Sequence, residues 1–110
     1  MASAAPVFSI AAYDRVAATA RGVMVAKAAA RGTANLDRQG ASGVAARLIE
    51  DKGSRILQYL RARATQQHLL ELGAAVPAEV QAQLAADVLD DCIDAVNYAI
   101  ILSVYLEATT

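Results

Sequence analysis

The chain lacks the residues that mark disulfide-rich or nucleic-acid-binding proteins. It has one Cys, no Trp and two Pro in 110 residues, and its 10 Lys and Arg are balanced by 11 Asp and Glu. A single cysteine excludes an intrachain disulfide and favours a reducing compartment, the cytoplasm. The net charge of −1 lacks the basic excess that non-specific nucleic-acid binding requires. We therefore expect a cytoplasmic protein with no nucleic-acid partner.

Leader and membrane signals are also missing. The segment Met1 to Ser9 has no basic n-region. The apolar stretch Ala99 to Leu106 falls far short of the roughly 20 residues that a membrane span needs. No membrane partner is expected.

Alanine is what the chain has in abundance. It occupies 27 of the 110 positions, and no segment shows the period-two alternation of a strand. Alanine favours helix but buries little surface, so packing or assembly must supply the stability. The sequence predicts a single all-α domain over residues 1–110, with three main helices.

Glycine, proline and capping residues set the expected helix limits. The first helix is expected from about Ser9, its N-cap, to about Arg31, with Gly32 as its stop. The segment Gly32 to Ala41 carries turn chemistry and is expected to be a loop. The second helix is expected to start near Ser42. Gly53 inside it either marks a kink or lets another part of the structure approach the helix closely. The segment after Arg63 either continues this helix or forms a short one of its own.

The third helix is expected from about Pro77 to Ala108. At about 100° per residue, one side of it forms an apolar stripe that is expected to be core. That stripe consists of Leu89, Ile93, Val96, Ile100 and Val104. The last turns are apolar nearly all round, which predicts burial on more than one side. With three helices available, a dimer or higher homo-oligomer would complete the helical bundle.

Asp87, Asp91 and Asp94 share another side of this helix, and Asp90 lies on the edge between the two sides. The four aspartates fall within eight positions. Like charges at i,i+3 and i,i+4 destabilise a helix, so the cluster needs a compensating reason. A Mg²⁺ or Mn²⁺ site is one, because hard divalent cations prefer carboxylates. Two other interpretations stay open, namely a helix that begins near Ala86, with the acids in its first turns, and a solvated acidic face.

The second helix offers a matching group. Glu50 and Asp51 stand beside Lys52 and Arg55, so acidic pairs could face each other across a groove whose basic residues suit phosphate. The same string is also typical of a surface ladder of i,i+4 salt bridges. On the third helix, Asn97 needs a hydrogen-bond partner, which a nucleotide or a neighbouring helix could supply.

Two segments carry a resemblance to a known family. One contains Arg47, Asp51, Lys52 and Arg55, and the other contains Asp90, Asp94, Asn97, Tyr98 and Ala99. With these motifs the chain resembles the nucleotide modification associated family. This family comprises small helical proteins of phages and bacteria that look like divergent relatives of the all-α, MazG-like NTP pyrophosphatases. Where the family has a Lys-rich D-Y-G signature, this chain has Lys27, Arg31, Gly32, Thr33 and Asn35.

The resemblance implies a Mg²⁺-dependent (or Mn²⁺-dependent) nucleotide-binding protein that hydrolyses a nucleoside triphosphate to release pyrophosphate. The implied metal ligands are Glu50, Asp51, Asp90, Asp91 and Asp94. The implied catalytic residues are Glu50, Asp51 and Asp94, and the implied substrate-binding residues are Arg47, Lys52, Arg55, Asn97 and Tyr98. Ser54 stands where the relatives' helix has a third acid. That difference favours the alternative, a non-catalytic helical module that binds a nucleotide or a protein.

Overall fold

The computed structural model describes residues 7–75 and 77–109, apart from the side chain of Gln81. Residues 1–6 of the segment that we examined for a leader lie outside this range. The elements are α1 (Ile10–Arg31), α2 (Ala34–Ala46), the π-helix η1 (Arg47–Gly53), α3 (Ser54–Glu71) and α4 (Ala78–Ala108). The described residues contain no strand, so the all-α prediction is confirmed.

The predicted limits of α1 are correct. The Ser9 hydroxyl accepts a hydrogen bond from the Ala12 amide at 3.0 Å, as an N-cap does. At the other end Gly32 has φ +71°, a conformation that ends a helix readily only at glycine, and its amide donates to the Ala28 carbonyl at 2.8 Å.

The loop predicted for Gly32 to Ala41 is wrong, because most of this segment belongs to α2. The amides of Leu36 and Asp37 both donate to the Thr33 carbonyl, at 3.0 and 3.2 Å, so the chain re-enters a helix two residues after α1 ends. Gly40, at φ +65° and ψ −172°, has non-helical backbone angles and separates a short helical segment, which starts at Ala34, from the longer helical segment that follows. The longer segment therefore starts close to the predicted position, near Ser42.

Beyond the kink at Gly40, the second predicted helix is one rod made of the rest of α2, η1 and α3. Gly53 closes the π-helical turn, where an added Cβ would lie 3.3 Å from the Leu48 carbonyl oxygen. Gly53 therefore permits a close approach of the rod's own backbone. The segment after Arg63 continues α3 to Glu71, and Gly73 follows at φ +84°. Pro77 then precedes α4 as predicted.

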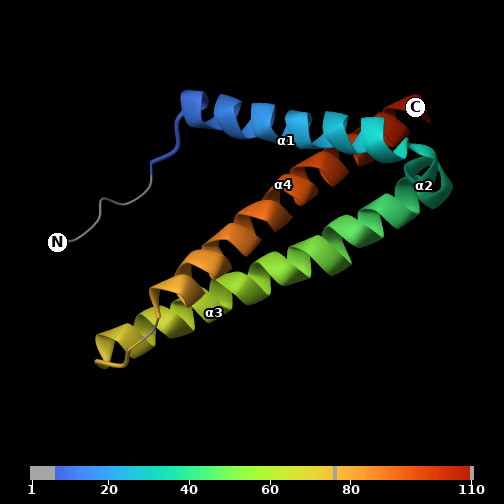
Figure 1. The fold of residues 1–110 in the computed structure, drawn as a ribbon. Helices are drawn as coiled ribbons and strands as arrows, with labels where there is room; N and C mark the ends of the chain where they lie inside the picture. The colour runs from blue at the N-terminus through green and yellow to red at the C-terminus, as the bar shows by residue number, and fades with distance from the viewer. Residues whose placement is uncertain (1–6, 76, 110) are drawn as a thin grey trace.

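The helices are arranged around α4. Figure 1 shows α3 and α4 running side by side in opposite directions, while α1 lies across the C-terminal half of α4. The chain is elongated, with extents of 54 × 29 × 28 Å and a radius of gyration of 17.1 Å. A compact domain of this length has a radius of gyration of about 13 Å. No helix in the described residues is long and apolar enough to cross a membrane.

The predicted core stripe of α4 is wrong for three of its five residues. Ile93 is buried and Val96 half-buried, but Leu89, Ile100 and Val104 are 56%, 56% and 59% exposed. The buried side of α4 is the polar one, which carries Asp91 and Asn97. A charge asymmetry accounts for this. All ten Lys and Arg lie between positions 15 and 63, so the acids of α4 find their partners on the other helices.

Candidate functional site

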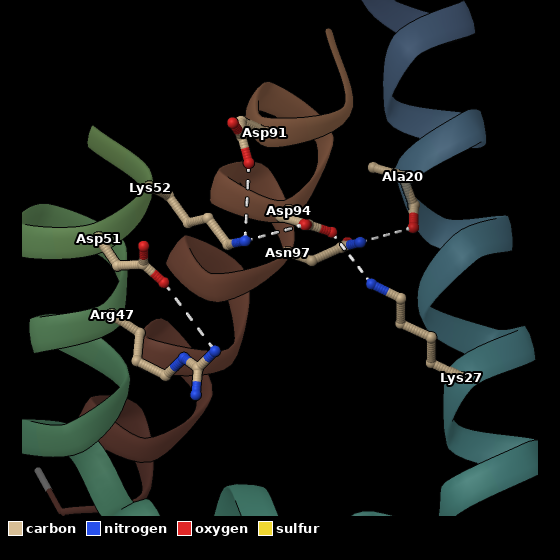
Figure 2. A network of polar contacts seen from close by, with 8 residues as sticks. All are labelled: Ala20, Lys27, Arg47, Asp51, Lys52, Asp91, Asp94 and Asn97. Atoms are coloured by element: carbon tan, nitrogen blue, oxygen red, sulfur yellow. Dashed lines mark hydrogen bonds and ion pairs between the residues drawn. The ribbon is translucent and has the colours of Figure 1, made fainter. Parts of the chain in front are cut away.

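Lys52 lies at the centre of a polar cluster between η1 and α4. Its ammonium nitrogen Nζ is 3.6 Å from Asp91 Oδ1 and 3.3 Å from Asp94 Oδ2, and its side chain is only 11% exposed. Figure 2 shows the lysine reaching from η1 toward the two carboxylates on α4. A buried ammonium is costly unless it is paired, and here it has two partners.

Asp91 is the most buried acid of the cluster, with a side chain 4% exposed. Its second oxygen, Oδ2, lies 3.3 Å from Arg55 Nε, in an ion pair that lacks hydrogen-bond geometry. The pKa of Arg55 is raised by its hydrogen bond with Tyr59 and then by the charge of Asp91. The arginine therefore stays charged and stabilises the buried carboxylate from the solvent side.

Asp94 joins three helices. Besides Lys52, it accepts a hydrogen bond from Lys27 Nζ of α1 at 3.0 Å. Partial burial alone would raise the pKa of Asp94, but the hydrogen bonds and charges of Lys27 and Lys52 outweigh burial and lower it. Asp94 is thus held as a carboxylate between α1 and η1.

Asn97 obtains its partner from a neighbouring helix, one of the two possibilities left open by the sequence. Its side-chain amide donates to the Ala20 carbonyl at 2.9 Å, and both residues are buried. The small Ala20 side chain lets α1 come close enough for this contact. Figure 2 shows the bond beside the Lys27 contact, so α1 is tied to α4 at two adjacent points.

Arg47 borders the cluster at the start of η1. A terminal guanidinium nitrogen, Nη2, lies 3.9 Å from Asp51 Oδ2, and the guanidinium carbon lies 5.8 Å from the centre of the Tyr98 ring. Both contacts are loose, the first because it joins partly exposed side chains. A stronger anionic partner could therefore draw the guanidinium away.

A pocket of about 250 Å³ opens beside this cluster, between α1, α2 and α4. Three cationic side chains line it, Lys27, Arg31 and Arg47, against the single carboxylate of Asp94. The remaining lining residues are Met24, Ala28, Gly32, Asn35, Leu36, Gln39, Asn97, Tyr98 and Ile101. The lining therefore carries a net positive charge, although the whole chain is slightly negative.

Two polar groups of the pocket lack partners within residues 7–75 and 77–109 of the chain. Arg31 makes no ion pair within the described part of the chain, and it stands on the pocket rim one turn after Lys27. Gln39 has a buried side-chain oxygen with no hydrogen-bond partner among the described residues. Arg31 is thus available to a bound anion, whereas the Gln39 oxygen is a buried acceptor that needs a donor group.

The structure gathers most of the predicted site residues but not all. Asp91 and Asp94 contact Lys52, Asp91 also contacts Arg55, and Arg47 lies over the Tyr98 ring, whereas Asn97 bonds to Ala20 of α1. The acidic pairs do not face each other across a groove, so that hypothesis is wrong. Glu50 and Asp90 are exposed, and Asp51 contacts Arg47.

The competing interpretations of the acids are largely resolved. Because α4 begins at Ala78, the aspartates are not in its first turns. Burial of Asp91 likewise contradicts a fully solvated acidic face. The salt-bridge ladder is present only as the Arg47–Asp51 pair, since Lys52 turns inward.

The donor set does not fit a divalent cation in this arrangement. Among the described residues, no three His, Cys, Asp or Glu side chains gather closely enough to hold a metal ion. Between Asp91 and Asp94, where a bridging cation would bind, lies the ammonium of Lys52. The implied magnesium remains a prediction.

The sequence interpretation missed much of the pocket. It did not assign Lys27, Arg31, Asn35 or Gln39 to a site. The spacing of Lys27 and Arg31, four residues apart at the end of a helix, was an available signal, because such residues share a helix face. The burial of Lys52 also had a signal in the sequence. Lys52 lies four residues from both Leu48 and Ile56, so it shares their side of the helix, which is the apolar stripe.

Comparison with known proteins adds no relative to this description. The chain matches no family model, no curated protein and no solved structure.

Proposed function

We propose that the chain binds the phosphate group of a nucleotide in the pocket between α1, α2 and α4. The observation that carries this proposal is the convergence of Lys27, Arg31 and Arg47 on one pocket that holds a single carboxylate. Guanidinium groups bind phosphate oxygens through paired N–H donors, and a positive cleft concentrates anions.

The size of the pocket indicates which part of the nucleotide it accepts. Its volume of about 250 Å³ lies below the roughly 300–1,000 Å³ of pockets that enclose drug-sized ligands. It therefore suits the phosphate end, with the nucleoside outside or along the Tyr98 ring at the wall. Gln39 and Asn35 offer polar contacts to a sugar hydroxyl or a base.

The arrangement favours binding over hydrolysis. Lys52 supplies the positive charge between Asp91 and Asp94 that a metal would supply in a pyrophosphatase. Magnesium-dependent pyrophosphate release is the second candidate, because Asp94 is both a pocket residue and a predicted metal ligand. To act as a metal ligand, Asp94 would have to give up its contact with Lys27 or Lys52 and bind the metal ion instead.

The test is thermal unfolding with nucleoside mono-, di- and triphosphates and with inorganic pyrophosphate, each with and without Mg²⁺. A ligand at 100 times its Kd adds about 2.7 kcal/mol of stability, which raises the Tm of a domain this size by more than 5 °C. Pyrophosphate release is measured in the same samples. If inorganic pyrophosphate raises the Tm as much as a nucleotide does, the site recognises only the phosphate groups.

Two arginines on α1 give a matched pair of variants. Arg31→Gln removes a pocket cation and is expected to weaken binding at least tenfold, since a charged hydrogen bond contributes about 1.5–3 kcal/mol. Arg21→Gln changes an exposed arginine of the same helix that does not line the pocket, and should bind as the wild type does. Absence of a shift with every nucleotide, or equal losses in both variants, would refute the proposal.

A further inference from the structure

The chain exposes more surface than a monomer of its size. Its accessible surface is 8107 Å², whereas a folded monomer of 11.5 kDa exposes about 5,800 Å². A standard interface covers about 800 Å² on each partner, and obligate homodimers cover more. The excess is therefore large enough to supply a stable interface.

One helix face accounts for an apolar part of this surface. We define the outer face of α4 by Leu89, Val96, Ile100 and Val104, which fall within about 80° of one another around the helix axis. Three of these four side chains are more than half exposed. Ile93 lies within the same arc but is buried inside the chain, so the face is not exposed along its whole length. The four aspartates of α4 lie within another arc of about 100°, on the polar side. From position 82 to position 106 the outer face carries no charge.

We propose that the outer face of α4 is the interface of a homodimer, in which two copies of α4 pack antiparallel about a two-fold axis near Val96. Such an axis sets Leu89 of one copy opposite Val104 of the other, because the two positions are equally far from it in sequence. The face is thus self-complementary, as a two-fold interface requires.

A second copy fits this face better than a partner of different chemistry. Leu89, Val96, Ile100 and Val104 follow one another at intervals of seven, four and four residues, which keeps them on one side of the helix. Small residues beside the seam, Ala85, Ala99 and Ser103, allow close approach of another helix. Asp91 and Asp94 pair with basic residues of the chain's other helices, and Asp87 and Asp90 lie outside the arc of the outer face, so the face itself brings no like charges together.

The first experiment measures mass by sedimentation equilibrium, without any ligand, so that its outcome is independent of the proposed function. The wild type is expected to sediment at twice 11.5 kDa. Ile100→Lys, which puts a charge on each side of the seam, is expected to raise the dimer Kd at least 100-fold and give a monomer. Val104→Lys is a second variant with the same expectation.

Leu57→Lys is the matched control. Leu57 is 47% exposed, similar to Ile100, but lies on α3, so this variant should remain dimeric. Far-UV circular dichroism checks that each variant keeps its helix content. The proposal is overturned if the wild type is monomeric at 100 times the protein concentration of the nucleotide-binding experiment. It is also overturned if Ile100→Lys and Leu57→Lys have equal masses.

The register is tested by cross-linking in a Cys92→Ser background. Val96→Cys lies near the axis, so two copies should form a disulfide on mild oxidation. Val104→Cys should not, because its two copies stand about 22 Å apart along the paired helices. Equal cross-linking at both positions indicates a parallel pair and overturns the antiparallel arrangement.

Discussion

The two faces of α4 reverse the usual arrangement of a surface helix. The polar face, with Asp91, Asp94 and Asn97, contacts the rest of the chain, whereas the apolar outer face is open to solvent. Polar contacts must satisfy geometry and charge at the same time, so they fix one arrangement of α1, η1 and α4. Apolar contacts are not directional and scale with area. The comparison teaches that the fold of the single chain depends on ion pairs, while apolar area is left for association.

The largest expected effect is at Lys52, the residue of η1 that pairs with the polar face of α4. Lys52→Met leaves Asp91 and Asp94 without their shared cation, and removal of one partner of a buried ion pair costs about 3–5 kcal/mol. We expect the lower end of this range, because Arg55 and Lys27 still contact the carboxylates. The free energy of unfolding in urea measures the loss.

A second substitution, Asp91→Asn, tests whether the stability lost in Lys52→Met can be recovered. Added to Lys52→Met, it neutralises the most buried carboxylate and should recover part of the lost stability. Ordinary surface substitutions change the free energy of unfolding by up to about 0.5 kcal/mol. A change no larger than this in Lys52→Met would show that the ion pairs on the polar face of α4 do not determine the fold.

A smaller effect is expected at Asn97. Asn97→Leu keeps the branched shape of the side chain but removes the hydrogen bond to the Ala20 carbonyl, which retains its bond within α1, so the cost is about 0.5–1.5 kcal/mol. Urea unfolding measures this difference, with Asn35→Leu as a control because Asn35 is exposed. Equal stabilities of the two variants would contradict a structural role for the Asn97–Ala20 bond.

The smallest effect is a dependence of stability on pH. The pKa of Asp94 is lowered below its ordinary 3.8, so its contribution is fully present above pH 3.8 and is lost as the pH falls through the lower, folded-state value. Asp94→Asn should flatten this part of the urea-unfolding profile between pH 5 and pH 2. Asp90→Asn, at an exposed position, should leave the profile close to that of the wild type. A profile unchanged by Asp94→Asn would show that its lysine contacts contribute no stability.

Local signals predicted the helices better than their contacts. Ser9, Gly32 and Pro77 placed the limits of α1 and α4 correctly, because capping depends on residues next to one another in the chain. The segment from Gly32 to Ala41 was misassigned, since glycine permits either a turn or a kink and only the surrounding packing selects one. The apolar stripe of α4 was assigned to the core for a similar reason, because periodicity identifies a face without naming its partner.

The candidate site was predictable in part. The motifs that contain Lys52, Arg55, Asp91 and Asp94 were singled out from residue type and spacing, and Lys52 does contact Asp94 while Arg55 contacts Asp91. Their pairing was not predictable, because whether a carboxylate faces a lysine or a metal depends on helices far apart in sequence. Gln39 and Arg31 enter the pocket only through the crossing of α1 and α2 over α4.

The sequence by itself determined that this protein is helical, where its longest helices begin and end, and that one helix carries acids on one side and apolar residues on the other. These properties follow from propensity, capping and the 3.6-residue period, which act within a few residues. Only the tertiary structure decided which side of α4 turns inward. That choice depends on the basic residues of α1 and η1 reaching Asp91 and Asp94, since an unpaired buried charge costs more than an exposed apolar stripe.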